Sequence, residues 1–232
     1  MKPLGIVTGL AAEAAIVEQA ALQLGRPRPR LAAAGADMRR AQAAAERLLR
    51  QGARRLISFG LCGGLDPTLR PGDLVLAEEV VFADGRRLAC DAAGRTALAE
   101  RLAAAGIPSV GGRLLAYHAL VADAAEKRRL FEATGAHAVD TESGGVARAA
   151  EAGKVPLLVV RAVADPARRR LPQAALAATD KDGAVRPGAL LAALCRRPWE
   201  IAVLPGLARD AACAKRTLTR VANAPGGLFG GD

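Results

Sequence analysis

The sequence contains few of the residues on which several classes of site depend. Aromatic residues make up 3% of the chain, and two histidines are present in 232 residues. The four cysteines show neither a CxxC pattern nor any other metal-ligand spacing: Cys62, Cys90, Cys195 and Cys213. We therefore expect no metal site, and the cysteine pattern fits a reducing cytoplasm.

Two nucleotide-binding motifs and the pattern of a membrane span are also missing. GxxxxGK[ST] does not occur, and GxGxxG does not follow the first expected strand, which argues against a nucleoside triphosphatase and a dinucleotide-dependent dehydrogenase. No run of about 18 apolar residues occurs, so we expect no membrane span. Near the N-terminus, Glu13 ends the first apolar run too early for a targeting segment, and strand-turn-helix is the better interpretation.

The charge of the chain is strongly basic. Its formal net charge of +10 comes from 33 Lys+Arg against 23 Asp+Glu. The basic residues are mostly arginine, and they are scattered along the chain without the aromatic side chains that stack on bases. We therefore expect no nucleic-acid partner, although the excess charge also suits phosphate or an anionic membrane surface.

Strand-like and helix-like segments alternate along the chain. We expect strands at residues 4–8, 30–34, 56–59, 73–81, 110–121, 138–141 and 155–163, with helices at 11–24, 38–50, 92–105, 123–134 and 144–153. Residues 60–67 read as a loop that no regular element could contain. The alternation predicts one α/β domain, a three-layer sandwich around a mixed, mostly parallel sheet, with a helical C-terminal extension from about residue 184.

Carboxylates and glycines follow several of the expected strands. In open α/β sheets, ligands bind beyond the carboxyl ends of the strands. Glu13, Glu142 and Asp165 are the carboxylates at these ends, and glycine turns follow three strands at Gly9, at Gly35 and in the 60–64 loop. We expect them to converge on one edge, where the glycine loop offers backbone N–H groups to ribose hydroxyls or phosphate.

The stretch from residue 137 to 147 is central to this prediction. It reads as a short strand that delivers Glu142 to a turn, with Ser143 as the cap of a following helix. Gly144 and Gly145 would each cost such a helix about 1 kcal/mol relative to alanine, so something must approach the backbone closely there. A ligand on the turn is one explanation, and tight packing of the helix against a strand is the one we favour from the residues alone.

Several segments together resemble the successive motifs of the nucleoside phosphorylase and methylthioadenosine/S-adenosylhomocysteine nucleosidase superfamily. They are GIVTG (5–9) with Glu13, SFGLCGGL (58–65) leading to PGDLV (71–75), VDTES (139–143) and RAVAD (161–165). The tail, with Leu171-Pro172, Asp182-Gly183 and RRPW (196–199), is similar to the hopanoid-associated branch, which removes adenine from adenosylhopane. The resemblance implies a nucleoside phosphorylase-like fold and cleavage of the N-glycosidic bond of a purine nucleoside.

The resemblance also implies roles for single residues. Glu142 would hold the ribose hydroxyls, Asp165 with a raised pKa would donate a proton or hydrogen bond to the leaving purine, and Glu13 would orient a water. From the residues alone, Asp165 could instead be a turn cap before Pro166, and Glu13 an ordinary glutamate in the first turn of a helix. Substrate contacts would come from Gly9, Gly60, Leu61, Cys62, Gly63, Leu120, Val121 and Thr141.

Hydrolysis and phosphorolysis both remain open at this stage. Phosphorolysis needs a cationic pocket near Gly35 and Gly60, for which Arg39, Arg40 and Arg161 are the candidates. We expect no cofactor apart from phosphate as a co-substrate. A methylthioadenosine-type nucleosidase, a general purine nucleoside phosphorylase and a non-catalytic nucleoside-binding or membrane-associated scaffold are the alternatives.

The sequence departs from the family pattern in ways that bear on the substrate. Thr141 stands where family members often have methionine, Ala164 where they often have serine, and Leu61-Cys62 replaces the usual serine or threonine of the glycine loop. These changes leave fewer polar groups to assist the nucleophile and the leaving base. Alternatively, they make the entrance of the site apolar, which would suit a ribose that carries a lipid. The expected partner is therefore an adenosine-containing small molecule or lipid, and we expect a homo-oligomer.

An apolar stripe marks the tail of the chain. Pro205 interrupts it, so we expect two shorter helices rather than one. The stripe would pack on the sheet or a second subunit, which we favour, or lie on the inner face of the membrane with arginines toward anionic lipid. Its residues are Trp199, Ile201, Val203, Leu204, Leu207 and Ala208.

Overall fold

The computed structural model describes residues 3–178 and 186–230, and one sheet of ten strands organises them. The strands are β1 (Leu4–Thr8), β2 (Arg30–Ala33), β3 (Arg55–Gly64), β4 (Leu74–Leu76), β5 (Glu79–Phe82), β6 (Arg87–Ala89), β7 (Ser109–Val110), β8 (Arg113–Ala116), β9 (Ala138–Asp140) and β10 (Leu157–Asp165). The helices are α1 (Ala11–Gln23), α2 (Met38–Arg50), α3 (Ala92–Ala104), α4 (Ala124–Thr134), α5 (Ser143–Ala152), α6 (Gln173–Ala178), α7 (Pro187–Arg196), the 3-10 helix η1 (Pro198–Val203) and α8 (Leu204–Asn223).

The sheet is mixed and mostly parallel, as predicted. Its order is β6-β5-β8-β9-β3-β10-β4-β7, with β1 between β2 and β3. The antiparallel pairs are β10 with β4, β3 with β9 and β5 with β6, and the other pairs are parallel. The long strand β3 pairs along its first half with β1 and at its end with β9. This arrangement brings the ends of β1, β3, β9 and β10 together.

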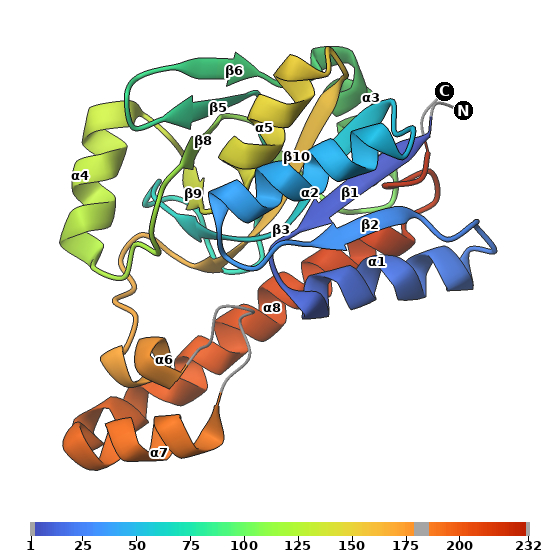
Figure 1. Cartoon of the computed structure of the whole chain (residues 1–232). Helices are drawn as coiled ribbons and strands as arrows, with labels where there is room; N and C mark the ends of the chain where they lie inside the picture. Colours follow the sequence, from blue (N-terminus) through green and yellow to red (C-terminus); the bar gives the residue numbers. More distant parts are fainter. Residues whose placement is uncertain (1–2, 179–185, 231–232) are drawn as a thin grey trace.

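Helices cover both faces of the sheet, which gives the three predicted layers (Figure 1). On one face, small residues of α2 and α5 pack against the sheet, with Ala45, Leu48 and Val146 among the fully or almost fully buried residues. On the other face, α1, α3 and α8 contribute Val17, Leu102 and Leu218 to a second core. The central strands are therefore buried on both sides, which explains their continuous apolar sequence.

The loop predicted at residues 60–67 was wrong for residues 60–64, which belong to a strand, whereas residues 65–67 lie outside any strand or helix. β3 runs on through Gly64 and pairs with β10 as far as Gly63. A Cβ atom on Gly60 would lie 2.5 Å from Nη1 of Arg161 and 2.7 Å from the carboxylate of Glu13. The glycine therefore leaves room for charged side chains beside a regular strand rather than allowing the chain to turn.

Two other predicted strands were too long. Residues 73–81 form two strands, because Ala77 donates its N–H to Val159 of β10 whereas Glu78 donates to Gly112 before β8. The chain thus changes partner at this point. The extended segment predicted at 110–121 is limited to β7 and β8, and the short elements β6 and α6 were not predicted.

Packing explains the paired glycines at the start of α5. A Cβ atom on Gly145 would lie 2.0 Å from the carbonyl oxygen of Met38, and one on Gly144 would lie 2.6 Å from Cβ of Ala116. The favoured explanation, tight packing, is therefore confirmed, but Gly145 packs against helix α2 rather than a strand. Asp140, not Ser143, accepts the N–H at the helix start, with 3.1 Å between Ser143 N and Asp140 Oδ1.

The C-terminal lobe, which we define as α6, α7, η1 and the first turns of α8, projects from the rest of the molecule (Figure 1). Pro205 does not break a helix, because it lies in the first turn of α8, where its missing N–H has no intrahelical partner to lose. The predicted start of the extension near 184, and Asp182-Gly183, fall outside the described residues. Among the described residues, no helix combines the length and apolar content that a membrane crossing requires.

Candidate active site

A cavity of about 250 Å³ lies where the carboxyl ends of β1, β3, β9 and β10 meet. Glu13, Glu142 and Asp165 all line it, so the structure brings the three predicted carboxylates together. A non-catalytic scaffold would be favoured if Glu142 or Asp165 were buried away from any pocket, and neither is. Six of the predicted substrate contacts also line the cavity: Leu61, Cys62, Gly63, Leu120, Val121 and Thr141.

The other two predicted substrate contacts, Gly9 and Gly60, lie behind the cavity wall. A Cβ atom on Gly9 would be 2.9 Å from Oε1 of Glu142, and one on Gly60 would meet Glu13. Both glycines therefore let carboxylates lie against the strand ends. They shape the site through neighbouring side chains and are not among the residues that line it.

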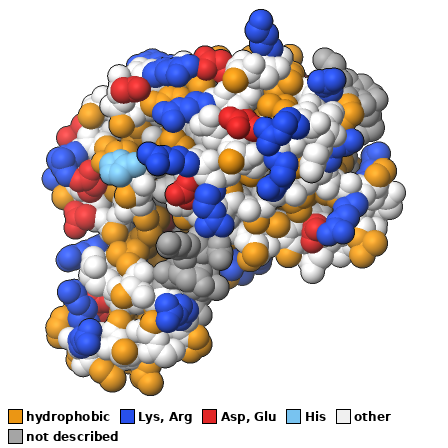
Figure 2. Space-filling model, viewed as in Figure 1, with side chains coloured by type: hydrophobic (Ala, Val, Ile, Leu, Met, Phe, Trp, Pro, Cys, Tyr) orange, Lys and Arg blue, Asp and Glu red, His pale blue; other side chains and the backbone are white. Residues whose placement is uncertain are grey.

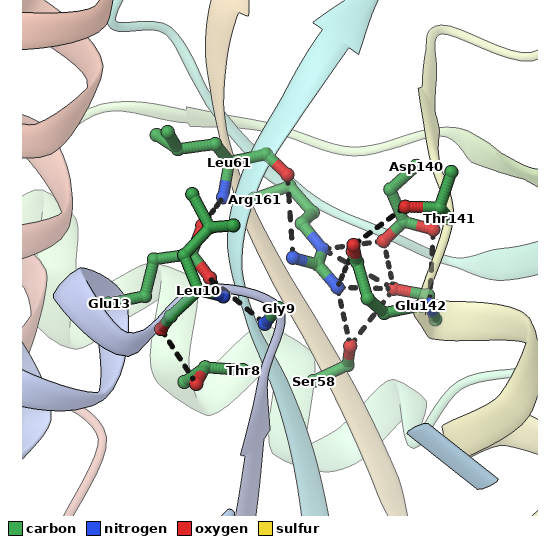
Figure 3. A network of polar contacts seen from close by, with 11 residues as sticks. Thr8, Gly9, Leu10, Glu13, Ser58, Leu61, Asp140, Thr141, Glu142 and Arg161 are labelled. Atoms are coloured by element: carbon green, nitrogen blue, oxygen red, sulfur yellow. Dashed lines mark hydrogen bonds and ion pairs between the residues drawn. The ribbon is translucent and has the colours of Figure 1, made fainter. Parts of the chain in front are cut away.

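Glu142 belongs to a buried network centred on Arg161 (Figure 3). Thr141 Oγ1 donates to Glu142 Oε1 at 2.7 Å, and Arg161 Nη2 lies 3.5 Å from Glu142 Oε2. The same guanidinium pairs with Asp140, with 2.7 Å between Nε and Oδ2. Burial raises the pKa of Glu142 to about 8, and Arg161 opposes that increase.

Arg161 itself is completely buried between strands and helix α5. Besides its two carboxylate partners, its Nη2 donates to Ser58 Oγ at 2.7 Å and to Ser143 Oγ at 3.0 Å. Burial would lower the pKa of Arg161, but Asp140 and Glu142 raise it overall, so the guanidinium stays charged. Arg161 does not line the cavity, and its donors are engaged within the protein.

Glu13 accepts hydrogen bonds from the backbone at the start of α1 and from the backbone of strand β3. Its Oε2 accepts the N–H groups of Gly9 at 2.9 Å and Leu10 at 2.8 Å, and its Oε1 accepts the N–H of Leu61 at 2.8 Å. The first two contacts are those of an N-terminal helix glutamate, whereas the third is long-range. Burial raises the pKa of Glu13 despite the nearby charge of Arg161.

Asp165 ends β10 and pairs with the buried side chain of Lys127 from α4. It is therefore an ion-pair partner rather than a simple turn cap before Pro166. Burial raises the pKa of Asp165 to about 6, with Lys127 as the largest opposing influence. An acid with this pKa carries a proton for part of the time near neutral pH, which suits proton donation.

The three remaining phosphate candidates lie near the start of α2. Gly35 has φ of 69°, and its N–H donates to the carbonyl of Gly9 at 2.7 Å. Arg39 and Arg40 are exposed in the first turn of α2 and do not line the cavity. Within the part of the chain that the structure describes, no group of three or more histidine, cysteine or carboxylate residues could hold a metal ion.

Four polar residues in or next to the site were not predicted as site residues: Ser58, Lys127, Asp140 and Ser143. Asp140 and Ser143 are adjacent to the predicted Thr141 and Glu142, and a buried charge on Arg161 would have required an acidic partner. The signal for Lys127 was its helical spacing from Leu130 and Phe131, which puts it on the apolar face of α4. Cys62 is buried, and burial raises the pKa of its thiol, which makes it a poor nucleophile.

The fold and the cavity define a three-layer α/β protein with carboxylates gathered at the carboxyl ends of its strands. The chain belongs to the phosphorylase superfamily, whose family model matches residues 11–196. The expected class of enzyme, a nucleosidase or nucleoside phosphorylase, is confirmed at that level.

Solved structures share this fold at low sequence identity. The methylthioadenosine/S-adenosylhomocysteine nucleosidase of Campylobacter jejuni is 20% identical, with a TM-score of 0.67 over 83% of this chain and 96% of that chain. A futalosine hydrolase mutant of Helicobacter pylori is 16% identical, with a TM-score of 0.63 over 85% of this chain and 98% of that chain. A mutant nucleosidase of Helicobacter pylori with 5′-methylthioadenosine in its active site is 15% identical, with a TM-score of 0.67 over 94% and 96%.

Proposed function

We propose that the protein hydrolyses the N-glycosidic bond of an adenosine-containing substrate and releases adenine. The observation that carries this proposal is the meeting of Glu13, Glu142 and Asp165 on one cavity. Cleavage of this bond passes through an oxocarbenium-like ribose, which a nearby carboxylate stabilises while an acid assists the leaving base. The names of the similar structures, which include nucleosidases and a futalosine hydrolase, agree with this chemistry.

Each carboxylate has a distinct part in the proposed reaction. Glu142 accepts hydrogen bonds from the ribose hydroxyls, which favour its ionised form once substrate is bound. Asp165 gives a proton to a purine nitrogen as the bond electrons move to the base. Glu13 orients the water that attacks the ribose carbon, and its bonds to Gly9, Leu10 and Leu61 fix its carboxylate.

Hydrolysis is favoured over phosphorolysis by the charges around the cavity. All of its lining residues are described, and none is lysine or arginine. A phosphate dianion in this cavity would face carboxylates without a cation beside it, which costs electrostatic energy. Water carries no such cost, so we expect water rather than phosphate as the nucleophile.

We propose further that the ribose carries a large apolar group, as in adenosylhopane, an intermediate of hopanoid lipid synthesis. Leu10, Leu61, Leu120, Val121 and Val139 line the cavity, and 61% of Leu120 is exposed. An apolar wall that continues to an exposed leucine suits a substrate that extends out of the site.

The C-terminal lobe supports a membrane location for this substrate. Trp199, Ile201 and Val203 of the apolar stripe are 69%, 59% and 43% exposed, so these residues are not buried against the sheet of their own chain. Leu191 of α7 is also 65% exposed. Figure 2 shows orange side chains along the lower rim of the lobe with blue ones beside them. Exposed tryptophan and aliphatic side chains with nearby arginines suit an anionic lipid surface.

The decisive experiment is incubation with adenosylhopane, 5′-methylthioadenosine and adenosine, each with and without phosphate. We expect adenine release from adenosylhopane at the same rate with and without phosphate. The ribose product should carry a hydroxyl group on C1′ rather than a phosphate. Dependence on phosphate would overturn hydrolysis, preference for the small nucleosides would overturn the lipid substrate, and no adenine from any of them would overturn the proposed function.

Vesicle sedimentation tests the membrane location separately. We expect binding to phosphatidylglycerol vesicles at low salt, weaker binding at high salt and little binding to phosphatidylcholine alone. Trp199→Ala should weaken binding, whereas Leu22→Ala should not, because Leu22 is 81% exposed but lies on α1. Concentration-dependent self-association through Trp199 without vesicle binding would show that a second subunit covers the stripe.

A further inference from the structure

Lys127 is a lysine without solvent exposure in the second turn of α4. Its Nζ contacts the carboxylate of Asp165 and lies 3.1 Å from the carbonyl oxygen of Pro166 and 3.2 Å from that of Arg169. A lysine is almost never fully buried unless it is paired. This one connects the proposed acid to the segment that leaves the site toward the C-terminal lobe.

The surroundings of Nζ match the charged form of the side chain. An ammonium group has three N–H donors and no acceptor, and here its partners are all oxygen acceptors, with the carbonyl oxygen of Asp165 as a fourth and more distant one at 3.5 Å. A neutral amine would direct a lone pair at one of these oxygens. Lys127 therefore supplies a fixed positive charge beside Asp165, although it does not line the cavity itself.

The contact orients the carboxylate of Asp165. Lys127 engages Oδ2, and among the described residues Oδ1 has no hydrogen-bond partner. Asp165 lines the cavity, so Oδ1 is the oxygen left for a ligand. Without the lysine, either oxygen could face the cavity and the side chain would have no fixed rotamer.

We infer that Lys127 is a positioning residue that holds Asp165 by one oxygen and stabilises the carboxylate left after the proton has gone to the base. This inference rests on the proposed function. In that step the C1′–N bond breaks and its electron pair goes to the purine. The O–H bond of Asp165 breaks and an N–H bond forms, so the carboxylate gains a negative charge next to the ammonium group.

Other charged groups near Asp165 are already paired. Arg169, which follows β10, pairs with Asp210 of α8, so their effects on Asp165 oppose each other. Cys62 of β3 is also close, but burial raises its pKa and keeps it neutral. Lys127 is therefore the group whose charge most strongly lowers the pKa of Asp165.

The experiment compares Lys127→Gln, which keeps a hydrogen-bond donor without the charge, with Lys127→Arg, which keeps the charge. Arg128→Gln is the matched control, because it removes a charge from the same helix at a side chain that is 71% exposed. Two quantities are measured in each protein. They are the pH at which kcat for adenine release falls on the alkaline side, and the pKa of Asp165 from its ¹³Cγ signal, assigned by comparison with Asp165→Asn.

We expect Lys127→Gln to move both midpoints upward by about 1–3 pH units, the usual effect of one adjacent opposite charge. The sign follows because Asp165 works when protonated and would keep its proton to higher pH without the ammonium group. Lys127→Arg should leave the midpoints nearer to wild type, and Arg128→Gln should leave them unchanged. In wild type, the ¹³Cε signal of Lys127 should shift at the same pH as Asp165, which tests the pairing even if Lys127→Gln does not fold.

Each alternative result has a separate meaning. Reduced kcat in Lys127→Gln with both midpoints unmoved would make Lys127 purely structural and overturn the inference. A ¹³Cε signal of Lys127 that stays constant over the pH range in which Asp165 gains its proton would overturn it as well. Lys127→Gln could shift the pKa of Asp165 as expected while the wild-type protein releases no adenine from any nucleoside. That result would overturn the proposed function, while the pairing of Lys127 with Asp165 would stand.

Discussion

Arg161→Met is the substitution whose effect follows most directly from the structure. The guanidinium is completely buried, with Asp140 2.7 Å away and Glu142 3.5 Å away, and it donates to Ser58. Methionine fills much of the space but leaves two buried carboxylates without their cation. Removal of one partner from a buried ion pair costs about 3–5 kcal/mol, because the remaining charge must be neutralised or hydrated. We expect a loss of this size in the free energy of unfolding.

Urea unfolding near neutral pH measures this loss. Arg161→Met should have a lower midpoint with an unchanged slope, which indicates a change in stability rather than in the unfolded state. Arg39→Met is the matched control. It removes the same charge at an exposed position, and its effect should lie within about 0.5 kcal/mol. If Arg161→Met were as stable as wild type but had lost a phosphate-dependent activity, Arg161 would be a phosphate ligand and this reasoning would be refuted.

Three further predictions concern the carboxylates and the glycine pair. Asp165→Asn should lower adenine release by about 10²–10⁴-fold with an unchanged circular dichroism spectrum, and near wild-type turnover would remove Asp165 from the mechanism. Burial raises the pKa of Glu142 from 4.5 to about 8, so its contribution to stability is present below pH 4.5 and is lost as pH rises toward 8. The stability difference between wild type and Glu142→Gln, measured by urea unfolding, should fall over this pH range, and a constant difference would contradict the raised pKa. Gly145→Ala should destabilise the fold, because its Cβ would lie 2.0 Å from the carbonyl of Met38, whereas thermal denaturation should show no loss for Gly188→Ala, whose Cβ meets nothing within 4 Å.

The carboxylates of the site could be located from the sequence because each follows an apolar run that marks a strand. Three apolar runs are each followed in the sequence by a carboxylate, and this pattern predicted that Glu13, Glu142 and Asp165 converge. All three line one cavity. The error at residues 60–64 has a physical cause. Glycine has low strand propensity, but here two glycines of β3 leave room for the side chains of Glu13, Arg161 and Asp165. Local propensity cannot report such a long-range requirement.

Partners far apart in the sequence explain what was missed. Lys127 precedes Asp165 by 38 residues, and Arg161 follows Ser58 by 103. The helix period places Lys127 on the same face of α4 as Leu130 and Phe131, which pack against the core, and it places Arg128 off that face. The pattern can therefore indicate that Lys127 faces inward, but it cannot identify Asp165 as its partner.

The positions of the two buried cations bear on the chemistry of the site. Arg161 and Lys127 both contact carboxylates that line the cavity, yet neither lines it. Each cation contacts its carboxylate without lining the cavity. The surface of the cavity therefore carries carboxylate oxygens and apolar groups. Such a face repels an anionic nucleophile, and it attracts a neutral nucleoside whose ribose becomes positive as the bond to the base breaks. Because the charge of both cations is already paired inside the protein, neither is available to phosphate, and this supports our proposal that water is the nucleophile.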